Sequence, residues 1–263
     1  MRLHAIHWFG GKGRMLRHLL PLMEDIPHDR YIEVFGGGCS ILLNKPIKSF
    51  ECYNDIDQGL YNFFTVISDP DMFDRFYRRV GLLPYCRQLF IDCKGGWETE
   101  EDPIKRAAMW YVVSRQSFGG DFSSGGWSSA TKKVSNGMAI TNGAWISALK
   151  KLPLIHERLQ RVQIENRDFR DILSRYDDPD TLFYLDPPYV DHTRSHGKYT
   201  HEMDNQDHKD MIEILHTIKG KAIVSGYDNK IYDPLNKWNK IKFNTSCSAA
   251  SKRKRNEYVW TNI

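Results

Sequence analysis

The stretch Leu182-Phe183-Tyr184-Leu185-Asp186-Pro187-Pro188-Tyr189-Val190 joins a short apolar run to an acid, two prolines and a tyrosine. Residues 181–185 have the length and composition of a buried parallel strand. Proline cannot donate to a strand ladder, so the chain must leave the sheet directly after Leu185. In open α/β sheets, ligands bind at the carboxyl ends of the strands. The stretch therefore predicts a buried strand that presents Asp186 and Tyr189 at a binding edge.

Those groups suit chemistry at the exocyclic amine of adenine or cytosine, which is a poor nucleophile because its lone pair is delocalised into the ring. A carboxylate and a proline carbonyl can accept both amine hydrogens and turn the lone pair toward an incoming methyl group, while the tyrosine ring offers a stacking surface. Asp-Pro-Pro-Tyr after an apolar strand resembles the signature of the amino-methyltransferases of DNA. The candidate catalytic residues are Asp186, Pro187, Pro188 and Tyr189. The alternative is a proline-rich strand exit whose acid is simply satisfied.

The composition is that of an ordinary soluble globular protein. The chain has 263 residues, of which 41% are hydrophobic and 27% charged, which excludes fibrous and disordered classes. No long apolar run and no signal-peptide core appear, so we expect a cytoplasmic protein without a membrane partner. Five cysteines without close pairing argue against a disulfide framework, and no zinc spacing appears. The net charge of +4 permits a nucleic-acid partner without demanding one.

Two glycine-rich turns lie near the start of the chain, each ahead of an expected helix. The first runs from His7 to Arg14 and precedes a helix expected from Met15 to Met23. It is not a P-loop, because Gly13 follows Lys12 where Ser or Thr should stand. Such a backbone can still cradle an anion. The alternative is a solvated lysine on a turn.

The second turn, Gly36-Gly37-Gly38-Cys39, follows a strand expected over residues 31–35 and precedes a helix expected from about Ile41. Strand, glycine turn and helix let a backbone approach a nucleotide closely. The dinucleotide fingerprint itself fails, because Ile41 occupies the third glycine position. Asp55 follows the next expected strand, residues 49–53, where an acid can accept hydrogen bonds from ribose hydroxyls.

Two further acids adjoin expected helices. Asp57 fits the first turn of the helix that follows it, and a metal site shared by Asp55 and Asp57 would lack a third ligand at useful spacing. Asp168 lies between a strand expected over 162–165 and a helix that runs to Arg175. From the residues alone, Asp168 is a helix N-cap.

The alternation of strands and helices lapses between about residues 69 and 160. Helical patterns at 71–79, 103–114 and 144–160 surround a loop from Arg115 to Asn142, and so long a connection is usually functional or mobile. Arginine can fork onto guanine, glutamine or asparagine onto adenine, and lysine can hold phosphates. The candidate DNA contacts in the loop are Arg115, Gln116, Phe118, Lys132, Lys133 and Asn136. The alternative is a flexible surface loop whose aromatic side chains pack down.

The C-terminal part returns to regular elements: a helix at 205–218 and strands at 221–224, 240–244 and 256–261. The basic run 251–255 lies between the last two strands. Its Lys252 and Arg253 are candidate contacts to the DNA backbone, unless the run is only a solvated tip. The histidine-rich segment 191–208 lacks metal spacing and fits a mobile lid better.

Taken in order, these features resemble the Dam-like DNA adenine-N6 methyltransferases over nearly the whole chain. The resemblance implies an α/β fold with the Rossmann-like, seven-stranded sheet of class I methyltransferases. It implies a catalytic domain over 1–68 and 161–263, and an inserted helical target-recognition subdomain over 69–160. The reaction expected from it is S-adenosylmethionine-dependent methylation of a flipped adenine, without a metal.

The same resemblance assigns residues to S-adenosylmethionine. Trp8, Gly11 and Lys12 would meet its carboxylate end, and Phe35, Gly37 and Gly38 its methionine part, with Cys39 where the last glycine of that loop is commonest. Asp55, chosen over Asp57 by register with the family, would bind the ribose. Asp168 and Phe169 would lie beside the adenine of the donor, and Asp186 beside the methyl-transfer centre.

Three alternatives stay open at this point. The target can be the N4 amine of cytosine, although Asp-Pro-Pro-Tyr leans toward adenine. Protein glutamine is a second target, which usually goes with Asn in place of Asp186. A catalytically weak DNA-binding relative is the third. A monomer on double-stranded DNA is the default expectation, while the recognition sequence, a cognate restriction endonuclease and a bacterial or phage-infected host are left open.

Overall fold

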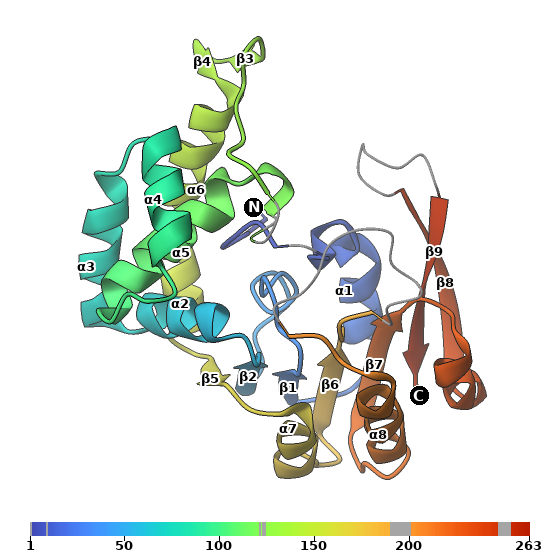
Figure 1. The fold of residues 1–263 in the computed structure, drawn as a ribbon. Helices are drawn as coiled ribbons and strands as arrows, with labels where there is room; N and C mark the ends of the chain where they lie inside the picture. The colour runs from blue at the N-terminus through green and yellow to red at the C-terminus, as the bar shows by residue number, and fades with distance from the viewer. Residues whose placement is uncertain (1, 9, 121, 123–124, 190–200, 247–253) are drawn as a thin grey trace. The chain divides into compact units, whose positions relative to one another are not determined.

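The computed structural model describes residues 2–8, 10–120, 122, 125–189, 201–246 and 254–263. Its contacts divide the chain into two compact units (Figure 1). The first consists of Met1–Pro21, Gly37–Pro46 and Asp57–Ile164, and the second of Leu22–Gly36, Ile47–Ile56 and Glu165–Ile263.

Six strands of a seven-stranded, mainly parallel sheet lie wholly in the second unit, and this sheet confirms the predicted Rossmann-like α/β fold. The strand order is β5-β2-β1-β6-β7-β9-β8. The strands are β1 (Arg30–Glu33), β2 (Phe50–Asn54), β5 (Gln163–Glu165), β6 (Thr181–Leu185), β7 (Lys221–Gly226), β8 (Asn239–Ser246) and β9 (Lys254–Thr261). β1 is parallel to β2 and β6, β6 is parallel to β7, and β9 is antiparallel to β7 and β8.

Apolar side chains from one face of this sheet pack against α7 (Phe169–Arg175), α8 (Asn205–Leu215) and η4 (Lys230–Lys237). All five residues of β6 are buried, as its unbroken apolar run predicted. The core on this face includes Ile32, Val34, Phe183, Leu185, Ala222 and Val224 from the sheet, and Ile172, Leu173, Met211 and Leu215 from the helices.

The strand order reverses direction at β1, whose neighbours are β2 and β6. Glu33 is paired with Tyr53 on one side and with Tyr184 on the other, so the three strands end at nearly the same level. The Val34 amide continues the ladder to the Tyr184 carbonyl at 3.0 Å. Crevices at such a reversal are the usual binding places of open α/β sheets. The fold therefore brings the residues after β1, β2 and β6 to one edge.

Helices form most of the first unit. They are η1 (Lys12–Arg14), α1 (Leu16–Glu24, which continues into the second unit), α2 (Gln58–Ser68), α3 (Pro70–Gly81), α4 (Arg87–Gly96), α5 (Pro103–Gln116), η2 (Phe118–Gly120) and α6 (Ile140–Leu159), with a hairpin of β3 (Val134–Ser135) and β4 (Met138–Ala139). The side chains of Asp57, Asp69 and Asp102 accept amide hydrogens at the starts of α2, α3 and α5. Phe63 of α2 stacks on Tyr111 of α5, with ring centroids 5.6 Å apart.

The structure differs from the expected local elements in three places: one expected helix is absent from the described residues, and two stretches contain elements that were not predicted. The helix expected from Ile41 is only a turn, with the Lys45 amide bonded to the Ile41 carbonyl at 2.9 Å, because Pro46 leaves no room to extend it. α4 was not expected, and the loop from Arg115 to Asn142 contains η2 and the β3–β4 hairpin.

The two contact units do not have the same boundaries as the predicted domains. The first unit includes α2 and the segments Met1–Pro21 and Gly37–Pro46 besides the helices after residue 69. The assignment of DNA reading to residues 69–160 concerns function and stays a prediction. Among the residues described, no helix is both long enough and apolar enough to cross a membrane.

Candidate active site

Asp186 and Tyr189 lie at the carboxyl end of β6, and partners in the second unit fix the tyrosine. The Tyr189 hydroxyl donates a hydrogen bond to Glu257 Oε1 of β9 at 3.1 Å. Its ring lies against that of Tyr227, which follows β7, with centroids 4.4 Å apart and planes tilted by 49°. Glu257 is only 7% exposed. The loop after β6 is therefore held both by a polar contact and by ring packing.

Asp186 is half-buried above the core of the second unit. Burial, and then the negative charge of Asp186, raise the pKa of the Tyr232 phenol far above its usual range. The Tyr232 hydroxyl shares a hydrogen bond with His208 Nδ1 at 3.2 Å, and both side chains are almost fully buried. Tyr232 is thus neutral over the physiological pH range, and its hydroxyl lies close enough to Asp186 for the charge of that acid to act on it.

The ends of β1, β2 and β5 are tied together by Asn54, which is 2% exposed. Its amide nitrogen donates to the Val34 and Arg167 carbonyls at 2.9 and 3.1 Å, and its amide oxygen accepts from the Arg167 amide at 2.9 Å. Next to it, Asn166 Nδ2 donates to the Asp55 carbonyl at 2.7 Å. These contacts hold the residue predicted to bind ribose beside the start of the segment that leads to α7.

Asp168 and Phe169 begin α7. The Asp168 carboxylate accepts the Arg170 amide hydrogen at 2.8 Å, so the residue is the N-cap that its position predicted. The Phe169 ring packs against that of Phe35, with centroids 5.7 Å apart. The second unit thus brings Phe35, Asp168 and Phe169 together at the edge of the sheet.

A second group of predicted residues gathers in the first unit, around Trp8. A Cβ on Gly37 would lie 2.7 Å from Trp8 Nε1, and a Cβ on Gly38 would lie 3.0 Å from Trp8 Cβ. The Gly11 amide donates to the Trp8 carbonyl at 3.2 Å, and Lys12 follows as a buried residue at the start of η1. Only glycine fits under the indole, and the positive φ of +46° at Gly37 also favours glycine.

Cys39, which stands where the resemblance expects glycine, has a backbone conformation that glycine adopts more readily than other residues. Its φ is +56°, in the left-handed region. A side chain there costs about 1–2 kcal/mol. The Cys39 side chain is fully buried, so packing offsets this strain.

Arg115 and Gln116 have structural contacts in this structure. Gln116 is 0% exposed; its Oε1 accepts from the Cys86 amide and from Trp127 Nε1, both at 3.2 Å. Arg115 donates to the His4 and Ala5 carbonyls at 2.6 and 2.7 Å. Both lie in the last turn of α5, where buried polar groups must find partners inside the protein. The prediction that Gln116 reads a base is not supported, and Arg115 holds the N-terminal segment.

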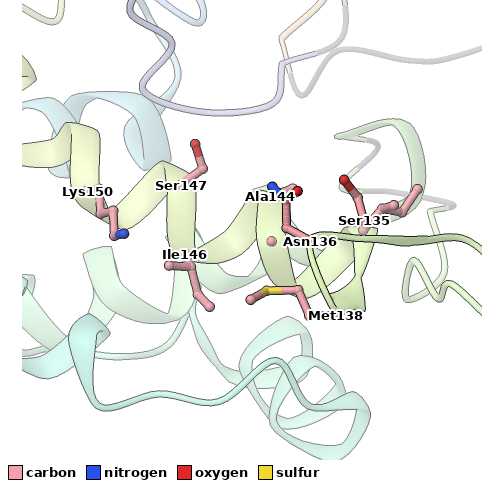
Figure 2. A pocket seen from close by; sticks show the side chains of 9 residues that line it. Ser135, Asn136, Met138, Ala144, Ile146, Ser147 and Lys150 are labelled. Atoms are coloured by element: carbon pink, nitrogen blue, oxygen red, sulfur yellow. The ribbon is translucent and has the colours of Figure 1, made fainter.

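The other predicted contacts of the loop are exposed. Phe118 is 74% exposed, and Lys132 and Lys133 are exposed ahead of the hairpin. Asn136 and Gly137 form its two-residue turn with φ of +51° and +75°, the Asn-Gly pair that such hairpins favour. The hairpin and α6 border a groove lined by Ser135, Asn136, Met138, Ile140, Gly143, Ala144, Ile146, Ser147 and Lys150 (Figure 2).

Several predicted residues belong to parts of the chain that the structure does not describe. Lys252, Arg253 and residues 191–200 of the predicted lid lie outside the described residues. Within the part of the chain that the structure does describe, no three His, Cys, Asp or Glu side chains gather to hold a metal ion.

The arrangement so far is an acid and a tyrosine at the end of β6, with carboxylates and aromatic rings at the ends of the neighbouring strands. A sequence model of the D12 class N6 adenine-specific DNA methyltransferases matches residues 8–246. The chain belongs to this family. No curated protein matches it. Membership makes the protein a DNA-modifying enzyme, and it favours adenine over the cytosine N4 target that the Asp-Pro-Pro-Tyr motif alone left open.

Four residues of this D12 class methyltransferase were not singled out from the sequence: Asn54, Arg170, Tyr227 and Glu257. Asn54 directly follows the strand expected over residues 49–53, and an asparagine at a strand end is a signal that could have been used. The partners of Tyr227 and Glu257 are 38 and 68 residues away from them in the chain, so no local pattern reveals them.

Replacing Glu257 tests whether its hydrogen bond to Tyr189 contributes to methyl transfer. Glu257→Ala removes a charged acceptor, whose bond is worth about 1.5 kcal/mol, so we expect methyl transfer to slow about tenfold. Glu257→Gln keeps an oxygen that can accept and should keep most of the rate. Single-turnover rates on unmethylated DNA measure this, with Glu213→Ala on the exposed side of α8 as the control. A Glu257→Ala enzyme as fast as the control would exclude the positioning role.

Proposed function

We propose that this protein transfers the methyl group of S-adenosylmethionine to the N6 amine of an adenine that has been flipped out of duplex DNA at specific sites. The proposal rests chiefly on the position of Asp186 and Tyr189 at the end of β6, beside the strand where the sheet order reverses. Family membership supplies adenine methylation in DNA; the donor, the flipping and the residue roles are inferred.

The residues present fit a nucleoside-bearing methyl donor. Phe35 and Phe169 provide an aromatic pair for its purine, and Asp55 and Asp168 provide carboxylates for hydroxyl and amine hydrogens. In the first unit, the glycine turn under Trp8 and the buried Lys12 suit a small anionic group. When bound, the donor supplies an electrophilic methyl group on a sulfonium.

Asp186 and the Pro187 carbonyl would each accept one hydrogen of the adenine amine. This holds the amine nitrogen so that its lone pair points at the methyl carbon, and the new N–C bond forms as the C–S bond breaks. The proton that the amine then loses has Asp186 as its nearest acceptor. Orientation and electrostatics account for the catalysis, so no covalent enzyme intermediate is needed.

Tyr189 would carry the flipped base. A paired and stacked adenine cannot present its amine to a donor held at the sheet edge, which is why flipping is expected. Because Tyr227 lies against one face of Tyr189, we expect the base to stack on the face turned away from Tyr227. The hydrogen bond to Glu257 keeps that ring in place.

Methyl transfer from labelled S-adenosylmethionine to unmethylated duplex DNA, followed by nucleoside analysis, tests the proposal. N6-methyladenine is the expected product. Label on cytosine N4 would contradict the assigned target. Binding of donor and DNA without transfer would indicate a DNA-binding relative that has lost turnover. Double-stranded DNA is the proposed partner; a cytoplasmic location, a monomer and a cognate endonuclease stay predictions.

For the DNA contacts we propose the exposed residues of the 69–160 region. Lys132 and Lys133 precede a hairpin whose turn presents Asn136, and the adjoining groove combines amide, hydroxyl, ammonium and apolar groups (Figure 2). Such a mixture suits contacts to base edges and thymine methyl groups, with the lysines on phosphates.

Replacing both lysines by alanine should weaken DNA binding and reduce its salt dependence. Each phosphate contact contributes about 0.9 to the slope of log affinity against log salt, so the slope should fall by about two. Fluorescence anisotropy over a salt series measures it. The control is Lys209→Ala with Lys219→Ala, two exposed lysines of the second unit. An unchanged slope would remove Lys132 and Lys133 from the proposed interface.

A further inference from the structure

Arg170 lies in the first turn of α7, directly after the two residues proposed to meet the adenine of the donor. Its guanidinium contacts three carboxylates: Asp168 at 3.1 Å, and Asp207 and Asp210 of α8, both at 2.6 Å. Its central carbon lies 4.4 Å from the centroid of the Phe169 ring. One side chain therefore touches both Asp168 and Phe169 and joins them to a second helix.

The two acids on α8 are themselves held in place. Asp207 accepts the Asp204 amide hydrogen at 3.1 Å as part of a capping box. Asp210 accepts from Gln206 Nε2 at 2.7 Å, and hydrogen bonds from Arg170 and Gln206 hold the pKa of Asp210 below its usual range. The Arg170 guanidinium is planar and always charged, and its hydrogen bonds to these two fixed acids give it one preferred orientation.

We propose that Arg170 is a positioning residue that sets the orientation of Asp168 and Phe169, and thereby the selectivity of the enzyme for the adenine base of its methyl donor. The inference rests on the proposed donor site. Asp168 receives the Arg170 amide on Oδ1 and the guanidinium on both carboxylate oxygens. A carboxylate has about four acceptor positions, so it can still accept from an adenine amine.

Arg170 also offsets the electrostatic repulsion among the three carboxylates that it contacts. Without it, Asp168, Asp207 and Asp210 would be three neighbouring carboxylates with no shared cation, and Asp168, whose side chain is 51% exposed, would keep its hydrogen bond to the amide of residue 170 but lose those from the guanidinium. Phe169 would lose the group that covers its ring. The adenine amine would then lack a fixed acceptor, while the position of the methyl-transfer centre at the end of β6 would be unchanged.

The test compares donor products that differ in the 6-substituent of the purine and in the proton that N1 carries as a result. S-adenosylhomocysteine carries the amine, and S-inosylhomocysteine carries a carbonyl in its place. Wild-type protein should prefer the adenosyl compound by about tenfold or more, because the inosyl carbonyl faces a carboxylate. Arg170→Gln should reduce that ratio to near one and raise the KM for S-adenosylmethionine about tenfold, with kcat changed less than about threefold. Arg170→Lys keeps the charge but not the forked guanidinium. Its preference ratio and its KM should lie between those of the wild type and those of Arg170→Gln.

Arg175→Gln is the matched control, because Arg175 is an exposed arginine on the same helix. It should keep the wild-type ratio and KM. An Arg170→Gln protein that still discriminates as wild type does, or that loses kcat in proportion to its lost folded fraction while KM stays at the wild-type value, would overturn the inference. If wild-type protein bound neither compound, the proposed donor site itself would be wrong, which is a different outcome.

Discussion

Asp186→Asn should reduce methyl transfer by about 10³-fold while the protein remains folded. The substitution keeps the shape of the side chain but replaces one acceptor oxygen by an amino group, which would meet the hydrogens of the adenine amine instead of accepting them. The lone pair of the amine would no longer be directed at the methyl carbon. Asp186 follows the last residue of β6 and is half-buried, so the strand and its core should tolerate the exchange.

Single-turnover methylation of a duplex oligonucleotide measures this loss, with thermal unfolding to show that the fold persists. Asp171→Asn is the matched control, since Asp171 is an exposed acid on α7. We expect the control to have the wild-type rate. If Asp186→Asn kept a rate within tenfold of wild type, another group would have to orient the amine.

Gly36→Ala should unfold or strongly destabilise the protein. A Cβ at this position would lie 2.1 Å from Tyr53 Cε2 and 2.4 Å from Tyr53 Cδ2. Tyr53 is fully buried in β2, and the Gly36 amide donates to the Asn54 carbonyl at 2.8 Å, so neither the ring nor the turn can move aside. Overpacking of this severity costs about 3 kcal/mol or more.

Urea denaturation measures the change, and Gly95→Ala provides the control. Gly95 lies in α4, and a methyl group added to it would have no neighbouring atom within 4 Å. Alanine there should therefore be neutral or should stabilise the helix by up to about 1 kcal/mol. A Gly36→Ala protein with the wild-type unfolding midpoint would show that the turn before Gly37 is far less constrained than its contacts indicate.

The features that the sequence predicts correctly are those set by neighbours in the chain. The apolar run before Asp186 specifies a buried strand, and Asp168 caps α7 because an acid ahead of a helix can accept its first amides. The expectation at Ile41 fails because one proline limits a helix that the pattern alone would allow. These outcomes depend on a few residues within one or two turns.

The features that the sequence misses depend on which side of an element faces the core. Gln116 belongs to a residue type that can read adenine, yet it lies inside the first unit and bonds to Cys86 and Trp127. Arg170 contacts acids 37 and 40 residues further along the chain. Such partners follow from tertiary packing, which no local pattern of charge or hydrophobicity records.

The position of β1 between β2 and β6 has a consequence for synthesis on the ribosome. β1 and β2 can pair as soon as Asn54 has emerged, but the other edge of β1 waits for β6, roughly 130 residues later and roughly 7–26 s at ordinary elongation rates. During that interval the apolar edge with Tyr31 and Ile32 is open to foreign strands. The nascent chain is therefore most prone to aggregate before residue 185 is made, and slower translation of the helical segments would lengthen that exposure.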